Sequence, residues 1–303
     1  FRIGTAGIGT LAAGEWVQIT TDSPDIQTGG ARGLFAGGYS PTNPSQSNVI
    51  GYINIDSTGN ATDFGDLTVA RIALAGLASR TRGVFGGGFV TPTNQDTIDF
   101  VTIASTGNAT DFGNLTTARH WVQPGSSSTR GLFASGNSAG GHVNTIDYIT
   151  IASTGNAVDF GDISYLASVT SGSSCSSSTR TIFGGGNIPG GSALNTIEFV
   201  TTSTLGNSAD FGDFTIGRSR EGRVSNAIRG VFGGGHGFVD TIDYITIATL
   251  GNATDFGDLT SSRGNIAGCS SPTRGCFGGG QTPTNLNTID YVQIMTTGNA
   301  VDF

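Results

Sequence analysis

The sequence contains no lysine, and charged residues of every kind are few. All 14 basic residues are arginine, and charged residues make up 12% of the 303-residue chain, against a usual share of about 25%. Acidic residues number 22, so the formal net charge is −8. Because nucleic-acid binding needs a basic surface that neutralises phosphates, this balance argues against nucleic acid as a partner.

Long apolar runs and cysteine are also scarce. No stretch of 18 apolar residues occurs, so no membrane insertion is predicted, and no signal peptide is recognisable. The chain begins with Phe1 rather than Met, which indicates processing or a place in a longer polypeptide. Three cysteines are too few for a disulfide framework. Cys269 and Cys276 flank a predicted hairpin and could meet, and the redox compartment stays open.

Glycine, by contrast, is abundant, with 50 residues against 8 prolines, and it recurs with a regular period. The phrase Arg-x-x-Phe occurs six times at intervals of 45 to 50 residues. We call this the first phrase. A second phrase, Ile-acid-aromatic-aliphatic, follows each copy, although its first copy reads Ile50-Gly51-Tyr52-Ile53. The third phrase, Gly-Asn-x-x-Asp-Phe, comes after the second in every repeat. Such a period is the signature of a repeat architecture.

Each phrase has the composition of a strand. Val, Ile, Phe, Tyr and Thr dominate over four to seven residues between Gly, Asn, Ser and Pro, and a less regular strand rich in small residues precedes each Arg-x-x-Phe, as over 72–79. We therefore predict an all-β fold with four antiparallel strands per repeat. One such sheet cannot bury both faces, whereas stacking in a closed ring leaves no exposed end. An open solenoid is the alternative, but it needs polar capping repeats, which are not visible.

The predicted fold is a six-bladed β-propeller in a single domain, 1–303. The repeated phenylalanines, such as Phe85 and Phe133, are expected between adjacent sheets. The blades are expected at about 14–69, 70–117, 118–165, 166–216, 217–261 and 262–303, with 1–13 as a candidate closing strand.

These phrases resemble kelch repeats. In a kelch blade an inner strand follows an arginine, a hydrophobic strand ends in Gly-Gly, and an aromatic-bearing strand and an outer strand come next. Ala70-Arg71, Val84–Gly88, Phe100 and Asp111–Leu115 match these places here, with Phe112 where kelch typically has tryptophan. The Asp-Phe-Gly-Asp-Leu-Thr variant is similar to repeats in structural tail or appendage proteins of marine bacteriophages. The resemblance implies a kelch-like propeller in a virion or another extracellular structure.

One arginine and one aspartate recur in each repeat, for example Arg82 and Arg130 with Asp111 and Asp159. Their equal numbers predict a repeated ion pair, because a lone buried charge is strongly destabilising. We interpret this pair as structural support for the turns, with a ring of charges for ligand capture as the alternative. The Asp-Phe-Gly-Asp pattern is interpreted as turn capping, with calcium binding as its alternative.

No catalytic constellation stands out. The three histidines lack the paired spacing of metal ligands, no helix follows the Gly-rich runs as it does in phosphate loops, and no Ser-His-Asp arrangement repeats. We expect no cofactor and no enzymatic activity. A carbohydrate-active or oxidase-type propeller enzyme is the remote alternative.

The connections between the first and second phrases vary most between repeats. Strand direction places all six at one end of the ring, together with the links between blades, and variable loops on a rigid scaffold are where recognition usually occurs. The alternative is that these loops merely tolerate change. The candidate binding residues are Tyr39, Asn43, Phe89, Asn94, Asn137, His142, Asn187, His236, Phe238 and Asn285.

The expected function is a non-catalytic structural or binding propeller of a virion appendage or other extracellular assembly. Aromatic side chains among Asn, Thr and Gly in the loops suit a cell-surface glycan or a flat protein partner. Other structural subunits of the assembly are the second kind of partner, and a purely architectural module making subunit contacts is the second hypothesis.

Overall fold

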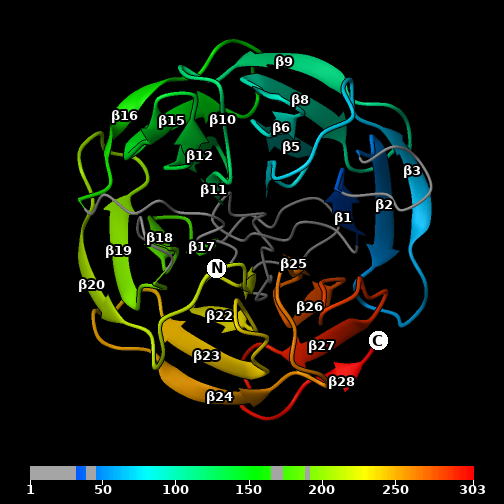
Figure 1. The fold of residues 1–303 in the computed structure, drawn as a ribbon, viewed down its shortest axis with the longest axis vertical. Coiled ribbons are helices and arrows are strands. Elements are labelled where there is room, and N and C mark those ends of the chain that lie inside the picture. The colour runs from blue at the N-terminus through cyan, green and yellow to red at the C-terminus, as the bar shows by residue number, and fades with distance from the viewer. Residues whose placement is uncertain (1–31, 39–45, 165–172, 188–191) are drawn as a thin grey trace, which may run out of the picture.

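The computed structural model describes residues 32–38, 46–164, 173–187 and 192–303, which contain strands and turns but no helix. These residues form antiparallel sheets whose strands follow chain order, first a three-stranded sheet and then five four-stranded ones. Figure 1 shows the sheets around a common centre, with the last strand of each at the periphery. The all-β prediction is confirmed, and the arrangement is propeller-like. The candidate closing strand 1–13 lies outside the described residues.

The repeated phrases form three strands of each sheet, and the less regular segment forms the strand nearest the centre. The innermost strands are β4 (Ala75–Ala78), β11 (Gln123–Ser126), β17 (Ser173–Ser176), β21 (Gly222–Ser225) and β25 (Ala267–Ser270). The Arg-x-x-Phe strands are β1 (Arg32–Ala36), β5 (Arg82–Gly86), β12 (Arg130–Ala134), β18 (Arg180–Gly184), β22 (Arg229–Gly233) and β26 (Arg274–Gly278). The second phrase forms β2 (Val49–Asn54), β8 (Thr97–Thr102), β15 (Thr145–Thr150), β19 (Thr196–Thr201), β23 (Thr241–Thr246) and β27 (Ile289–Gln293). The outer strands are β3 (Thr62–Asp66), β9 (Thr110–Asn114), β16 (Val158–Asp162), β20 (Ala209–Asp213), β24 (Thr254–Asp258) and β28 (Val301–Asp302).

Two small sheets accompany the main ones. One is the hairpin of β6 (Phe89–Val90) and β7 (Thr93–Asn94); the other joins β10 (Arg119–His120), β13 (Asn137–Ser138) and β14 (Gly141–His142). Both arise from the variable connections, and β10 lies on the link that leads into the next innermost strand. The variable connections and the links therefore pair at the same end of the sheets.

The hydrophobic core lies between neighbouring sheets. Phe133 is fully buried and packs with Val84 and Phe112 of the preceding sheet. A methyl group on Gly86 would lie 2.6 Å from ring atom Cε1 of Phe133, so only glycine fits beneath this ring. The expectation that the repeated phenylalanines lie between sheets is confirmed here.

The glycine of Arg-Gly-x-Phe contacts the innermost strand of the preceding sheet. A side chain on Gly131 would begin 2.9 Å from Cδ1 of Leu77. The fourth copy of the phrase carries Thr181 instead of glycine, and the residue that faces it is Gly125. At this contact a glycine on one sheet therefore faces a larger residue on the neighbouring sheet. The glycine lies on the Arg-x-x-Phe strand at Gly131 and on the innermost strand at Gly125.

Gly131→Thr should lower the free energy of unfolding by about 1–3 kcal/mol, because the added atoms overpack a filled contact. Leu77→Gly should remove much of that penalty in the double variant, which recreates the Gly125–Thr181 arrangement. Urea unfolding of wild type, both single variants and the double variant measures the coupling between the two sites. Strictly additive effects would contradict this size matching.

The arginine of Arg-x-x-Phe joins neighbouring sheets through a carbonyl. The Arg82 guanidinium lies 4.5 Å from the ring centroid of Phe100 in its own sheet, and its Nη1 donates to the carbonyl oxygen of Ile151 in the next sheet at 2.8 Å. Arg274 makes the same bond from the last sheet to Ile55 beside the first, at 2.9 Å. Both kinds of contact recur at Arg32, Arg130, Arg180 and Arg229.

The predicted ion pair between Arg82 and Asp111 is wrong. Asp111 and its equivalent Asp159 are exposed on outer strands, while Arg82 and Arg130 are held by an aromatic ring and a carbonyl oxygen. A carboxylate that stays in water needs no partner, so equal numbers of the two residues did not imply pairing.

Buried ion pairs instead involve the aspartate of the second phrase. Asp147 in β15 lies 3.1 Å from Nη2 of Arg119, and neither side chain is exposed. Asp147 also accepts bonds from the backbone N (3.0 Å) and Oγ1 (2.7 Å) of Thr116. The pair ties the link between two sheets to the third strand of the later sheet. It recurs as Arg71–Asp99, Arg218–Asp243 and Arg263–Asp290.

The repeats that lack this arginine also lack the aspartate. In the fourth repeat, Ala167 occupies the arginine position of the sequence, and buried Glu198 replaces the aspartate and accepts a bond from the backbone N of Ser164 at 3.1 Å. In the first repeat Gly51 replaces the aspartate, and no arginine occurs over 3–31. Only the first repeat therefore lacks both groups, while in the fourth repeat the buried Glu198 carboxylate is held by Ser164 and Ser208 in place of an arginine.

The Gly-Asn turn joins sheets at the periphery. The backbone N of Gly155 donates to the carbonyl oxygen of Phe112 in the preceding sheet at 2.7 Å, and Oδ1 of Asn156 accepts from the backbone N of Asn114 at 3.1 Å. Gly113 allows this approach: its φ is +146°, and a Cβ there would lie 2.4 Å from the oxygen of Gly155. The third phrase therefore begins with a turn that docks on the neighbouring sheet and continues into an outer strand.

Candidate binding site in the central cavity

The innermost strands line a cavity of about 1630 Å³. Its lining runs from the links between sheets, at Ile72 and Asn265, to the turns that follow the innermost strands, at Ser79 and Ser271. Small-molecule sites usually measure about 300–1,000 Å³. The cavity therefore has room for a ligand of several linked rings.

Small side chains and serine hydroxyls form much of the wall. Ser126 Oγ donates to the carbonyl oxygen of Ala78 in the preceding innermost strand at 2.9 Å. Ser270 Oγ donates in the same way to Ser225 at 2.8 Å. Small residues were expected where innermost strands converge, and these serines also satisfy backbone groups that no neighbouring strand reaches.

Four non-glycine residues with left-handed backbone conformation lie at one end of the cavity, which we call the mouth. Each stands two positions after a buried arginine: Ala73, Trp121, Arg220 and Asn265, with φ of 55°, 56°, 61° and 57°. All four line the cavity. This conformation costs a non-glycine residue about 1–2 kcal/mol, yet a chain with 50 glycines places none here. Such strain clusters at functional sites.

An aromatic corner occupies one part of the mouth. The His120 ring lies 4.2 Å from Trp121 and 5.0 Å from Phe89, measured between centroids. Its Nδ1 lies 2.6 Å from Oδ1 of Asn94. Burial lowers the pKa of His120, a backbone hydrogen bond with Asn137 opposes this shift, and the charge of His142 adds to it, so the neutral imidazole is favoured. The corner offers ring faces beside an amide, an arrangement suited to a sugar ring.

Several of the predicted binding residues lie at this end. Phe89 and Asn285 line the cavity. Asn94 supports His120, and Asn137 pairs with His120 in the small sheet. His142 is half-buried at the end of β14. The structure thus brings together residues from the variable connections of the second and third sheets.

The remaining predicted residues lie away from the cavity lining or outside the described residues. His236 and Phe238 are exposed on the connection of the fifth sheet, and Phe238 has a φ of 54°. Asn187 is buried and forms an isolated bridge with Ala193. Tyr39 and Asn43 lie outside the described residues.

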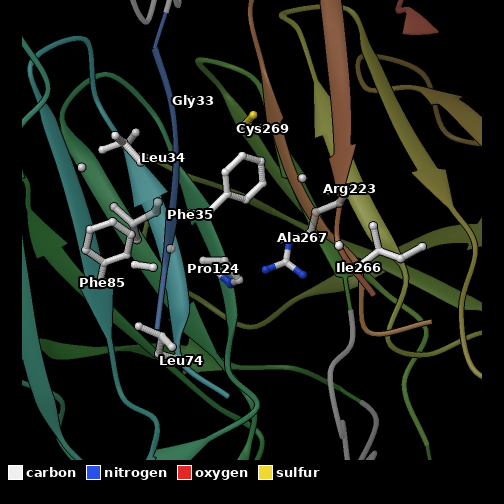
Figure 2. A pocket seen from close by; sticks show the side chains of 18 of the residues that line it. Gly33, Leu34, Phe35, Leu74, Phe85, Pro124, Arg223, Ile266, Ala267 and Cys269 are labelled. Atoms are coloured by element: carbon white, nitrogen blue, oxygen red, sulfur yellow. The ribbon is translucent and has the colours of Figure 1, made fainter. Parts of the chain in front are cut away.

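Sequence reasoning missed the residues on the links and the innermost strands. Trp121 and Arg220 both follow the buried arginine by two positions, a spacing visible in the sequence once that arginine is identified. Figure 2 shows the side chain of Arg223 directed into the cavity from β21. This residue sits in a segment interpreted only as a tightly packed strand.

The two cysteines that flank the predicted hairpin are neighbours in the structure. Cys269 and Cys276 lie directly opposite each other in β25 and β26, and both are free thiols. A hydrogen bond to Cys276, together with burial, raises the pKa of Cys269. Cys269 also packs against Gly33 of the first sheet, so this pair contributes to the contact between the last sheet and the first.

A comparison with protein-family models and with curated proteins finds no match to this chain. Among the described residues, no group of three or more His, Cys, Asp or Glu is placed to hold a metal ion. That part of the chain likewise has no helix with the length and apolar character needed to span a membrane.

Proposed function

We propose that the chain is a closed, six-bladed, kelch-like propeller whose mouth binds a glycan or protein on a cell surface, without catalysis. The bond from Arg274 to Ile55 between the last and first sheets supports closure, and six copies of each phrase support six blades. The proposed setting is a virion appendage or other extracellular assembly. The similarity of the Asp-Phe-Gly-Asp-Leu-Thr variant to repeats in bacteriophage tail or appendage proteins supports this setting.

The strained residues at the mouth carry this proposal. Ala73, Trp121, Arg220 and Asn265 occupy equivalent positions in four repeats but differ completely in chemistry. A purely structural role would favour glycine at each of them, because glycine adopts positive φ without a steric penalty. Four different side chains held at one opening favour recognition of an asymmetric ligand.

The use of the buried carboxylates supports a non-catalytic role. Asp99, Asp147 and Asp243 are committed to ion pairs with arginine and to bonds from a threonine. A general acid or base must exchange a proton with substrate, and these groups are buried away from the cavity. His120 is paired with an amide rather than with a carboxylate.

A purely architectural role is the second candidate, and exposed apolar side chains favour it. Val158 and Val301 on outer strands are each 54% exposed, and Leu205 and Leu250, in the turns before outer strands, are 56% and 59% exposed. Apolar residues around the periphery are suited to contacts with sister subunits.

Trp121→Ala and Phe89→Ala should each weaken adhesion to the target cell surface by about tenfold or more, since buried aromatic anchors dominate binding energy. Binding of the full chain to cells and to an immobilised glycan panel measures this. Phe238→Ala tests whether the exposed connection of the fifth sheet also contributes.

Leu205→Ser is the matched control, because it changes an exposed apolar residue at the periphery. It should leave adhesion unchanged. Adhesion that survives both aromatic substitutions, combined with loss of subunit assembly in Leu205→Ser, would instead establish the architectural role.

A further inference from the structure

The lining of the central cavity has the opposite charge balance to the whole chain. The chain carries 22 acidic residues against 14 arginines. Among the described residues, the cavity is lined by one carboxylate, Glu221, and by the four arginines Arg32, Arg80, Arg220 and Arg223. A low-dielectric hollow lined mainly by one sign of charge focuses the field and concentrates ligands of the opposite sign. The cavity is therefore suited to an anion.

Arg223 in β21 differs from the equivalent residue of every other innermost strand in the described part of the chain. The residues that correspond to it in the other innermost strands are Gly76, Pro124, Ser174 and Gly268, as the pairing with the Arg-x-x-Phe strands shows. All four are small. Packing therefore does not account for a long cationic side chain in this one strand.

The Arg223 guanidinium has no hydrogen-bonding partner among the described residues. It also forms no ion pair with another residue in the described part of the chain, and its side chain extends into the cavity (Figure 2). Burial lowers the pKa of Arg223, while the charge of Glu221 opposes that shift. Arginine nevertheless stays cationic at neutral pH. A partly desolvated guanidinium whose N–H groups lack hydrogen-bond acceptors is unfavourable, and a bound anion would supply them.

The remainder of the lining is rich in groups that hydrogen-bond hydroxyls. Serines of the innermost strands and of the turns that follow these strands line the cavity. Near the mouth the lining includes Asn265, Gln281 and Asn285. Amides and hydroxyls both donate and accept, which matches the hydroxyl groups of a sugar. The aromatic corner at Phe89 and Trp121 adds ring faces at the entrance.

We propose that the cavity binds a carboxylate-bearing saccharide and that Arg223 holds its carboxylate. A guanidinium presents two parallel N–H donors to the two oxygens of a carboxylate. The serine and amide groups take the sugar hydroxyls, and the neighbouring ring of the saccharide lies at the aromatic corner. This inference rests on the proposed glycan binding and names the chemical class of that glycan.

Isothermal titration calorimetry of the full chain with trigalacturonate tests the proposal. Its methyl ester is the matched ligand, because it keeps the sugar rings and removes the charge, and inorganic sulfate supplies charge without a sugar. Wild type should bind trigalacturonate, and bind the ester and sulfate at least about tenfold more weakly, the size expected when a charge-assisted hydrogen bond is lost.

Arg223→Ser is the matched variant, because the fourth sheet carries a serine, Ser174, at the equivalent position of its innermost strand. It should weaken trigalacturonate binding by about tenfold or more and leave the melting temperature unchanged. Arg223→Lys should recover part of the affinity. Glu221→Gln should tighten binding, since it removes the carboxylate of the lining.

Equal binding of trigalacturonate by wild type and Arg223→Ser would overturn the proposal, as would equal binding of trigalacturonate and its ester. Binding of sulfate as tight as that of trigalacturonate would show an anion site without saccharide specificity and would also overturn it. Cell adhesion that depends on Trp121 but not on Arg223 would leave the proposed function standing while this inference fails.

Discussion

Asp147→Ala should lower the free energy of unfolding by about 3–5 kcal/mol, because it leaves the buried Arg119 guanidinium without its counter-charge. Both side chains are fully buried, and Thr116 loses two hydrogen bonds in the same substitution. Burial already lowers the pKa of Arg119, and Asp147 opposes that shift. Guanidinium chloride unfolding followed by intrinsic fluorescence measures the loss.

Asp159→Ala is the control, since Asp159 is exposed on the neighbouring outer strand of the same sheet. It should unfold with the wild-type midpoint. The double variant Arg119→Ala/Asp147→Ala should be more stable than the sum of its two single changes predicts, as in the first repeat, which lacks both charges. A large loss in Asp159→Ala and none in Asp147→Ala would restore the pairing inferred from the sequence.

Phe133→Ala should also lower the free energy of unfolding by about 3–5 kcal/mol, through lost burial and the cavity that remains. Phe133 is fully buried, and its ring fills the space over Gly86 of the preceding sheet. The innermost strands cannot readily close the gap, because serine hydrogen bonds hold them together. Thermal melting and guanidinium chloride unfolding measure the effect.

Phe238→Ala provides the comparison for Phe133→Ala, because Phe238 is 39% exposed on a connection and its removal leaves no internal cavity. Its unfolding should match wild type within the error of the measurement. If Phe133→Ala unfolds with the wild-type midpoint, the packing of neighbouring sheets is not the main source of stability.

The strands could be predicted because their signals are local. In the second sheet, Arg82–Gly86, Thr97–Thr102 and Thr110–Asn114 form strands where β-branched and aromatic residues lie between turn residues. The repetition of three phrases strengthened each of these predictions six times over. Stacking of the sheets followed from the apolar faces that one sheet alone cannot cover.

The ion pairs could not be assigned from residue counts. Arg82 and Asp111 recur together, but Arg82 is satisfied by a ring and a carbonyl oxygen and Asp111 faces solvent. A better signal was that the aspartate of the second phrase is replaced, by Gly51 and by Glu198, in the two repeats that lack the arginine equivalent to Arg119. That pattern is visible in the sequence once the aspartate of the second phrase is considered.

The candidate site was predicted only in part. The variable connections were expected at one end, and Phe89 lies at the mouth as part of an aromatic corner. Trp121 and Arg223 were missed because a link and an innermost strand carry no local signal of exposure to a cavity. Their role depends on how the sheets converge, which no single repeat contains.

The sequence by itself determined the strand content, the order of strands within a repeat and the need for each sheet to pack against its neighbours. These properties depend on side-chain alternation and turn residues a few positions apart. Only the tertiary structure decided which charges pair, that Thr181 faces Gly125, and that arginines gather around one cavity. The partners in such contacts are brought together by packing between sheets, as in the bond from Arg82 to Ile151 across 69 positions, and short-range propensity carries no information about them.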